Sequence, residues 1–455
     1  MKIIVVGLGQ AGNLLIASLA NENYDVVVID KDRKAVDAAT DKYNVNGVVG
    51  SGASRDTLLK AGADTADAIV SLTHVDEINL LSCMQAKSLG TRYAAARILM
   101  PDFVSEAEEL KKQYNIDFFM RPRLDIAEEI YRNMGMPGFA KLEGFWGNEI
   151  QLVNMNILDD SVLNGRSLID IKQSSKMDIL IISVIRNGRL YIPHGDFIIQ
   201  SGDSINVALS KKNMDESLSV LGIKRSKAKK TVIVGGSNTC IYLLELLKKL
   251  NSSVTIMEQD SARCRELMEK YPEINVAYAG GATLEVLEEE QVSKADMIIS
   301  LTDNDETNLV VSMYAWSCNI PSIITRVDRP EHLKLLHKVN IDITVSPAES
   351  SALKAFRFLL GHEAEDAGKD MGKFYLVADG MAETVEFTAG DDFKGIGIKF
   401  SDKAFKLKKD VLVTALLRDG EVIIPSGMTS IRKGDHVIVT SSRKKHIRSL
   451  NEIIV

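Results

Sequence analysis

The chain has 455 residues, of which 45% are hydrophobic and 26% are charged, and its formal net charge is −7. This length predicts about three domains, and the negative charge excludes a protein-wide basic field of the kind that binds nucleic acid. No apolar run approaches the roughly 20 residues that cross a bilayer, and residues 1–2 lead directly into a strand pattern instead of a signal peptide.

The first thirty residues predict a dinucleotide-binding unit. An apolar, β-branched strand at 2–6 runs into the motif G-L-G-Q-A-G at 7–12, an apolar-periodic helix follows, and a second strand at 25–29 ends at Asp30. Gly7 permits a tight turn, Gly9 lets a pyrophosphate approach the backbone, and Gly12 lets helix and strand pack closely. Asp30 follows Gly12 by 18 residues, where a carboxylate accepts hydrogen bonds from ribose hydroxyls and disfavours a 2′-phosphate.

Strand and helix patterns then alternate to about residue 97, which predicts a doubly wound parallel sheet. We expect helices at 34–43 and 77–89, and strands at 45–49 and 66–73. Ligands bind such sheets at the carboxyl ends of the strands. Beyond residues 7–12 and Asp30, these ends carry Ser51, Gly52, Thr73, His74 and Arg97.

The pattern recurs in the second half of the chain. The segment S-L-T-H-V-D-E-I-N-L at 71–80 matches S-L-T-D-N-D-E-T-N-L at 300–309, with seven of ten positions identical. The same shift carries Arg97 onto Arg326, and a shift one residue shorter carries Asp30 onto Glu258. This collinear series indicates a tandem duplication.

Each Rossmann-like half is followed by a smaller β-rich segment. Arg186-Asn-Gly matches Arg418-Asp-Gly, and Gly202-Asp matches Gly434-Asp. Because Asn-Gly and Asp-Gly are hairpin turn signals, we expect two small α+β modules with antiparallel strands. The predicted domains are 1–140, 141–225, 229–360 and 372–455. The basic stretch at 224–230 is interpreted as a solvated linker, with contact to an anionic surface as the alternative.

The second glycine loop departs from the motif. Only Gly235 survives, while Ser237 and Cys240 stand where the second and third glycines would be. A Cβ at Ser237 hinders phosphate approach and Cys240 loosens helix–strand packing, although Glu258 could still hold a ribose. We therefore expect weak or altered nucleotide binding at Gly235 and Glu258, with a purely structural copy as the alternative.

These features resemble the RCK (KTN) family. The resemblance rests on the G-L-G-Q-A-G loop, the S-L-T-x-x-D-E-x-N segment, the arginine that closes the fifth strand, and the I-P-x-G and G-D pattern of the small module. It covers essentially the whole chain, in the order of two tandem modules. It implies two Rossmann-like doubly wound parallel-sheet domains, each followed by a small α+β (RCK-C) domain.

The resemblance also implies a function. Members are cytoplasmic regulators at the inner face of the plasma membrane, assembled as rings, usually homotetramers, beneath a membrane potassium transporter subunit of the TrkH-like kind. Their N-terminal domains bind NAD, as NAD+ or NADH, or adenine nucleotides such as ATP and ADP. Carried onto this sequence, the cofactor site consists of Gly7, Leu8, Gly9, Gln10, Ala11, Gly12, Asp30, Thr73, His74 and Arg97. The alternatives are a salt bridge across the domain for Arg97 and a simple rim position for His74.

The competing hypothesis is an NAD-dependent oxidoreductase acting on a small-molecule substrate. Hydride transfer needs an acid or base beside the nicotinamide, and none of the seven histidines stands with a carboxylate in a recognisable catalytic arrangement. No metal-ligand spacing occurs, and the four scattered cysteines are expected to be buried, reduced thiols. We therefore predict a regulator with no catalytic residues and no metal site.

Overall fold

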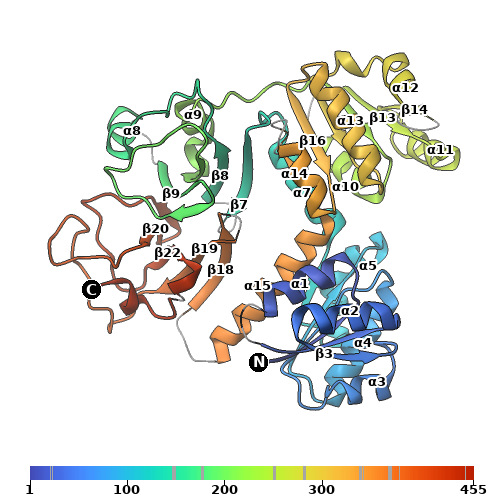
Figure 1. The fold of residues 1–455 in the computed structure, drawn as a ribbon, viewed down its shortest axis with the longest axis horizontal. Helices are drawn as coiled ribbons and strands as arrows, with labels where there is room; N and C mark the ends of the chain where they lie inside the picture. The colour runs from blue at the N-terminus through green and yellow to red at the C-terminus, as the bar shows by residue number, and fades with distance from the viewer. Residues whose placement is uncertain are drawn as a thin grey trace.

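The computed structural model describes the chain except residues 21, 23, 146–149, 176–178, 249–252, 280–282, 338–340, 342, 367–370, 379 and 446. Four sheets follow one another along the chain, alternately parallel and antiparallel. Figure 1 shows the two parallel sheets in one half of the view and the two antiparallel sheets in the other. This order confirms the predicted tandem duplication.

The first domain is a six-stranded parallel sheet in the order β3-β2-β1-β4-β5-β6. Its elements are β1 (Lys2–Val6), α1 (Gln10–Ala20), β2 (Asp25–Asp30), α2 (Arg33–Tyr43), β3 (Asn46–Val49), α3 (Arg55–Lys60), β4 (Ala68–Ser71), α4 (Asp76–Leu89), β5 (Tyr93–Arg97), α5 (Pro101–Ser105), α6 (Ala107–Tyr114) and β6 (Phe118–Met120). The doubly wound prediction is confirmed. The strand expected at 66–73 spans only Ala68–Ser71, and beyond its carboxyl end the N–H of Thr73 bonds the side chain of Asn79. The sixth strand was not predicted.

The second domain repeats this topology in the order β14-β13-β12-β15-β16-β17. Its elements are β12 (Lys230–Val234), α10 (Asn238–Leu247), β13 (Ser253–Glu258), α11 (Ser261–Lys270), β14 (Asn275–Tyr278), α12 (Leu284–Glu289), η3 (Val292–Lys294), β15 (Met297–Ser300), α13 (Asp305–Ser317), β16 (Ser322–Arg326), α14 (Pro330–His337) and β17 (Thr344–Val345). The central strands of both sheets are almost fully buried and β-branched, as strands covered on both faces require.

The small domains carry antiparallel sheets with equivalent strand orders, β7-β8-β11-β9-β10 and β18-β19-β22-β20-β21. The first contains β7 (Ala140–Phe145), β8 (Ile150–Asn156), α8 (Leu168–Ser175), β9 (Ile179–Arg186), β10 (Arg189–Tyr191), β11 (Ser204–Ser210), η2 (Lys211–Asn213) and α9 (Met214–Val220). The second contains β18 (Met371–Val377), β19 (Ala382–Thr388), β20 (Val411–Arg418), β21 (Glu421–Ile423), β22 (His436–Ser442), η4 (Arg443–Lys445) and η5 (Leu450–Ile453). The predicted small α+β modules are thus confirmed.

The matched motifs of the small domains have a structural cause. The turns at Asn187 and Asp419 both have positive φ and are followed by glycines with positive φ, as two-residue hairpins require. Arg186 bonds Asp203 through two nitrogens at 2.7 Å, and Arg418 bonds Asp435 in the same way. Both aspartates are buried, so each charge is stabilised by its bidentate partner.

The two halves exchange a helix. The helix α7 (Pro122–Asn133) follows the first parallel sheet, yet its buried residues pack with α10 of the second domain. The helix α15 (Pro347–Asp366) follows the second sheet and packs with α1 of the first domain. Figure 1 shows α15 running down beside α1. Each of these two helices thus completes the core of the opposite half.

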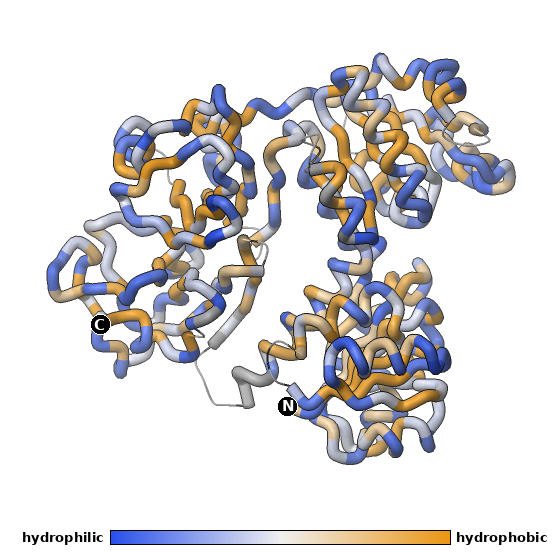
Figure 2. The backbone as a smooth tube through the Cα atoms, viewed as in Figure 1, coloured by the Kyte–Doolittle hydropathy of each residue, from blue (hydrophilic) through white to orange (hydrophobic). Residues whose placement is uncertain are grey.

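The small domains also share a core. Phe145, Ile182 and Ala208 of the first pack in one apolar cluster with Ala415 and Ile438 of the second. Figure 2 shows the hydrophobic residues concentrated along the strands and inner helix faces, with hydrophilic residues along many outer turns. None of the helices in the described residues combines the length and apolar character that crossing a bilayer requires. The domain boundaries given above stay predictions.

Candidate nucleotide site

The loop at 7–12 is held in one conformation by two of its glycines. Gly7 has φ +94°, and a Cβ there would lie 2.9 Å from the backbone nitrogen of Thr73. A Cβ at Gly12 would lie 1.9 Å from the carbonyl oxygen of Gly7. Gly9 differs, because its nearest neighbour would be Nε2 of His74 at 3.5 Å, an ordinary contact. The fold therefore requires glycine at 7 and 12, while at position 9 it leaves an open surface.

Asp30 ties this loop to the end of β2. Its Oδ2 accepts the N–H of Leu8 at 2.7 Å, and its Oδ1 accepts the N–H of Asp32 at 2.9 Å. The carboxylate is half-buried and lines the cavity beside the loop. Each carboxylate oxygen keeps a further lone pair, so Asp30 can accept a ribose hydroxyl without breaking either bond.

A buried asparagine organises the end of β4. Asn79 is fully buried, and its Oδ1 accepts from Ser71 Oγ, Thr73 N and Thr73 Oγ1. Its Nδ2 donates to the carbonyls of Thr73 and Arg97. We did not single out Asn79 as a site residue, although the repeated S-L-T-x-x-D-E-x-N segment contains it. Its presence in both halves was the available signal.

Arg97 lies behind the cavity. It is buried, and its Nη2 donates to the Thr73 carbonyl at 2.8 Å and lies 3.5 Å from Nδ1 of His74. Burial lowers the pKa of Arg97 to about 10, and burial followed by the charge of Arg97 lowers the pKa of His74. Within the described parts of the chain Arg97 forms no ion pair. The site thus places an imidazole with a lowered pKa in front of a buried arginine that forms no ion pair among the described residues.

The structure gathers most of the predicted residues around one cavity of about 240 Å³. Gly7, Gly9, Asp30, Thr73 and His74 line it, whereas Leu8, Gln10, Ala11 and Gly12 form the adjoining loop and first turn of α1. Arg97 stands one layer behind the lining. Further lining residues that we did not assign as site residues are Val6, Ile29, Lys31, Gly50, Gly52, Leu72, Val75 and Ile78.

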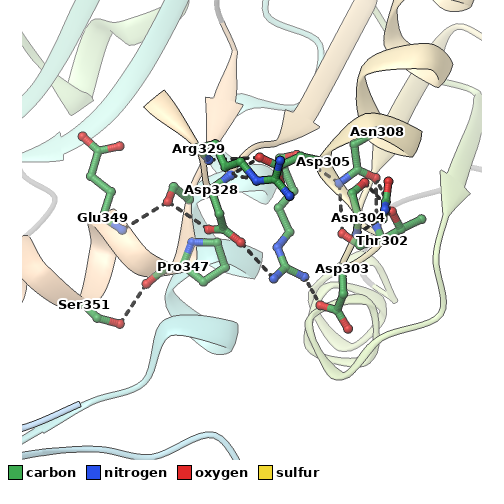
Figure 3. Close-up of polar contacts among 12 residues, drawn as sticks. Thr302, Asp303, Asn304, Asp305, Asn308, Asp328, Arg329, Pro347, Glu349 and Ser351 are labelled. Atoms are coloured by element: carbon green, nitrogen blue, oxygen red, sulfur yellow. Dashed lines mark hydrogen bonds and ion pairs between the residues drawn. The ribbon is translucent and has the colours of Figure 1, made fainter. Parts of the chain in front are cut away.

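The second half keeps the same framework. Gly235 has φ +104°, and a Cβ there would lie 2.9 Å from the nitrogen of Thr302. Glu258 accepts the N–H groups of Gly236 at 2.6 Å and Asp260 at 2.8 Å. Asn308 bonds Thr302 as Asn79 bonds Thr73 (Figure 3). The lost glycines have therefore not collapsed the turn, and the cavity here is larger, about 670 Å³.

The charges of the second cleft are arranged differently. Arg326, the counterpart of Arg97, forms ion pairs with Asp303 and Asp328, both labelled in Figure 3. Arg263 of α11 instead reaches the loop, where its Nε donates to the Gly236 carbonyl at 2.6 Å. Ser237 Oγ is buried and has no hydrogen-bond partner among the described residues. The prediction of weak or altered binding at this cleft stays a prediction.

The structure also bears on metal binding and on the cysteines. In the described residues, no group of three or more His, Cys, Asp and Glu side chains is placed to hold a metal ion. Cys83, Cys240 and Cys264 are buried and unpaired, and Cys318 is half-buried and unpaired. Burial raises the pKa of Cys240 to about 12, so its thiol stays protonated. The expectation of burial is confirmed for the first three cysteines and is wrong for Cys318, while the reduced state stays a prediction.

Comparison with known proteins gives a consistent result. The family model described as the TrkA-N domain matches residues 3–118 and 231–347, and the TrkA-C domain model matches residues 152–222 and 385–454. The chain is 31% identical over 448 residues to "Trk system potassium uptake protein TrkA homolog 2" of Methanosarcina mazei, covering 96% of this chain and 97% of that protein. It is 28% identical over 460 residues to "Trk system potassium uptake protein TrkA" of Haemophilus influenzae, covering 100% and 98%.

Solved structures share the fold. "Crystal Structure of the GsuK RCK domain" has a TM-score of 0.63 at 16% identity and covers 98% of this chain and 93% of that chain. "GsuK channel bound to NAD" has a TM-score of 0.62 at 16% identity and covers 98% and 77%. The curated relatives are named as potassium uptake proteins, which agrees with the prediction that the chain is not an enzyme.

Proposed function

Because this chain belongs to the TrkA family, whose TrkA-N and TrkA-C domains it carries twice, we propose that it is a nucleotide-sensing regulatory subunit of a potassium uptake system. The observation that carries the proposal is the glycine loop tied to Asp30 in a chain whose relatives are potassium uptake proteins. The proposed partner is a TrkH-like membrane potassium transporter. Copies of the chain would form a ring, with a tetramer as the expected state, at the inner face of the plasma membrane.

The first cleft is the proposed binding site for NAD+ or NADH, with ATP or ADP as further ligands. The N–H groups of the loop and of the α1 N-terminus would receive the phosphates, for which the open surface at Gly9 leaves room. Asp30 would accept the ribose hydroxyls, and its charge disfavours the 2′-phosphate of NADP. Arg97 would add a buried positive charge behind Thr73 and His74.

The groups at the cleft favour sensing over chemistry. A dehydrogenase needs a group that exchanges a proton with substrate beside the nicotinamide. Among the described residues, His74 is the only imidazole that lines the cavity. Its Nδ1 lies against Nη2 of Arg97, which keeps this nitrogen an acceptor. Catalytic consumption of NADH with a small-molecule substrate would favour the oxidoreductase alternative.

Ligand occupancy can reach the rest of the chain through α1. The helix begins at the glycine loop, packs along its length with α15 of the second half, and is followed by Glu22. Glu22 Oε1 accepts Arg443 Nε of the second small domain at 2.9 Å. A ligand shifts an equilibrium only by its differential affinity for the two states, typically about 1–3 kcal/mol per site. Several such sites in a ring would bias a pore from mostly closed to mostly open.

The test is potassium flux in liposomes that contain the transporter and the purified chain. Asp30→Ala or Gly9→Val should abolish the response to NADH while leaving assembly intact. Asp37→Ala on the exposed side of α2 is the matched control, because it removes the same charge away from the cleft. A normal NADH response from the Asp30→Ala and Gly9→Val proteins would refute the assigned site. An unaltered protein that ignores adenine nucleotides would refute the function.

A further inference from the structure

The cleft of the second half contains a residue from the first half. Arg123 lies in the first turn of α7, the helix that packs against α10 of the second domain. It lines the cavity of about 670 Å³ together with the loop residues Gly235 and Ser237 and the carboxylate of Glu258. The exchange of helices thus places a cation of the first domain beside the second glycine loop.

Two arginines line this cleft in the described part of the chain, Arg123 and Arg263, and Arg123 is the one without an ion pair there. Arg263 pairs with Glu266 at 2.6 Å, and Arg326 pairs with Asp303 and Asp328. Among the described residues, Arg123 makes a single hydrogen bond, from Nη1 to the carbonyl of Leu99 at 3.1 Å. A guanidinium has five N–H donors. The half-buried side chain therefore keeps most of its donors and its whole charge for another anion.

The acidic groups of the cleft are engaged elsewhere. Glu258 accepts two backbone N–H groups at the end of β13, and Asp260 caps α11 by accepting from Ala262 N at 2.8 Å. Asp303 pairs with Arg326. None of these carboxylates lies within ion-pair distance of Arg123 in the described part of the chain. An incoming anion would supply the missing partner.

Arg123 also touches the framework of the first cleft. Its acceptor, Leu99, lies two residues beyond Arg97, and the N–H of Leu99 donates to Asp76 Oδ2 at 2.7 Å. Asp76 is buried in the first turn of α4, the helix that carries Asn79. A ligand bound to Arg123 would therefore be connected, through Leu99, to the segment that positions Arg97 and Thr73.

We propose that Arg123 completes the second cleft as a composite site for the phosphate groups of a nucleoside diphosphate. The ribose would lie at Glu258, and the phosphates would lie between the α10 N-terminus, Arg263 and Arg123. Because Ser237 hinders the close approach of a phosphate to the loop backbone, charge-assisted contacts from Arg263 and Arg123 would take the place of that approach. The proposal rests on the proposed nucleotide-sensing function and adds the residue that joins the two halves at the ligand.

The experiment is an isothermal titration of the full chain with ADP, in the Asp30→Ala background that silences the first cleft. We expect one ADP per chain, an affinity about tenfold weaker after Arg123→Gln, and partial recovery with Arg123→Lys. Arg132→Gln on the same helix is the control, because Arg132 lies outside this cleft. Thermal unfolding of each variant confirms that it folds.

The outcomes separate this proposal from the proposed function. Equal ADP affinity for the Arg123→Gln protein and its parent overturns the role of Arg123. Absence of ADP binding in the Asp30→Ala background, when the unaltered chain binds ADP, overturns the composite site and leaves the first cleft standing. Absence of any adenine-nucleotide binding by the unaltered chain overturns both.

Discussion

Gly9→Ala should weaken NAD binding without lowering the stability of the fold. Gly9 has no positive φ, and an added Cβ would have only Nε2 of His74 as a neighbour, at 3.5 Å. The unliganded protein should therefore keep its stability or gain about 0.4–1 kcal/mol, because alanine restricts the unfolded chain. The same Cβ would occupy the surface against which a pyrophosphate lies. Loss of one charge-assisted hydrogen bond costs about 1.5–3 kcal/mol, so NAD should bind about 10–150-fold more weakly.

The assay combines thermal unfolding of the unliganded protein with isothermal titration of NAD. Gly12→Ala is the matched control, because its Cβ would lie 1.9 Å from the Gly7 carbonyl oxygen and must open the turn. That variant should lose about 1–3 kcal/mol of stability together with its NAD binding. Unchanged NAD affinity in the Gly9→Ala protein would show that the phosphates do not lie against this residue.

Three further predictions concern the framework. Asn79→Leu should lower the free energy of unfolding by about 3 kcal/mol, because the Ser71 hydroxyl and the carbonyls of Thr73 and Arg97 lose their hydrogen bonds to Asn79. A urea denaturation curve that matches the unaltered protein would contradict this. Burial raises the pKa of Glu383 from its ordinary value near 4.5 to about 7. The folded form therefore holds a proton that the unfolded chain releases between these values, so stability falls as pH rises from about 4.5 to 7. Glu383→Gln should remove that fall, so at pH 8 its free energy of unfolding should exceed that of the parent by about 3 kcal/mol. Denaturation of both proteins at pH 5 and pH 8 measures this. An equal change in stability between the two pH values for both proteins would refute the shifted pKa. Residues 1–225 alone should not remain monomeric, because they leave uncovered the α1 face that α15 packs against; a stable monomer in light scattering would argue against this.

Local patterns predicted much of the first cleft. The order of strand, glycine loop, helix and Asp30 depends on contacts within thirty residues, and the loop bonds Asp30 as the dinucleotide motif requires. The repeat also indicated the corresponding positions of the second half, where Glu258 and Asn308 form the same bonds as Asp30 and Asn79. Asn79 was not singled out because a buried asparagine carries no periodic signal; its repetition at Asn308 marked the position, and its hydrogen bonds show its role.

The sequence by itself thus determined the fold class, the duplication and the first loop, because backbone propensity, apolar periodicity and glycine sterics act over short stretches of chain. Only the tertiary structure decided which domain the helices α7 and α15 complete. It also decided that Arg326 is neutralised by Asp303 and Asp328, and that Arg123 enters the cleft of the other half. The physical reason is that α7 and α15 present apolar faces that either half could bury, and the choice between them depends on packing across more than a hundred residues.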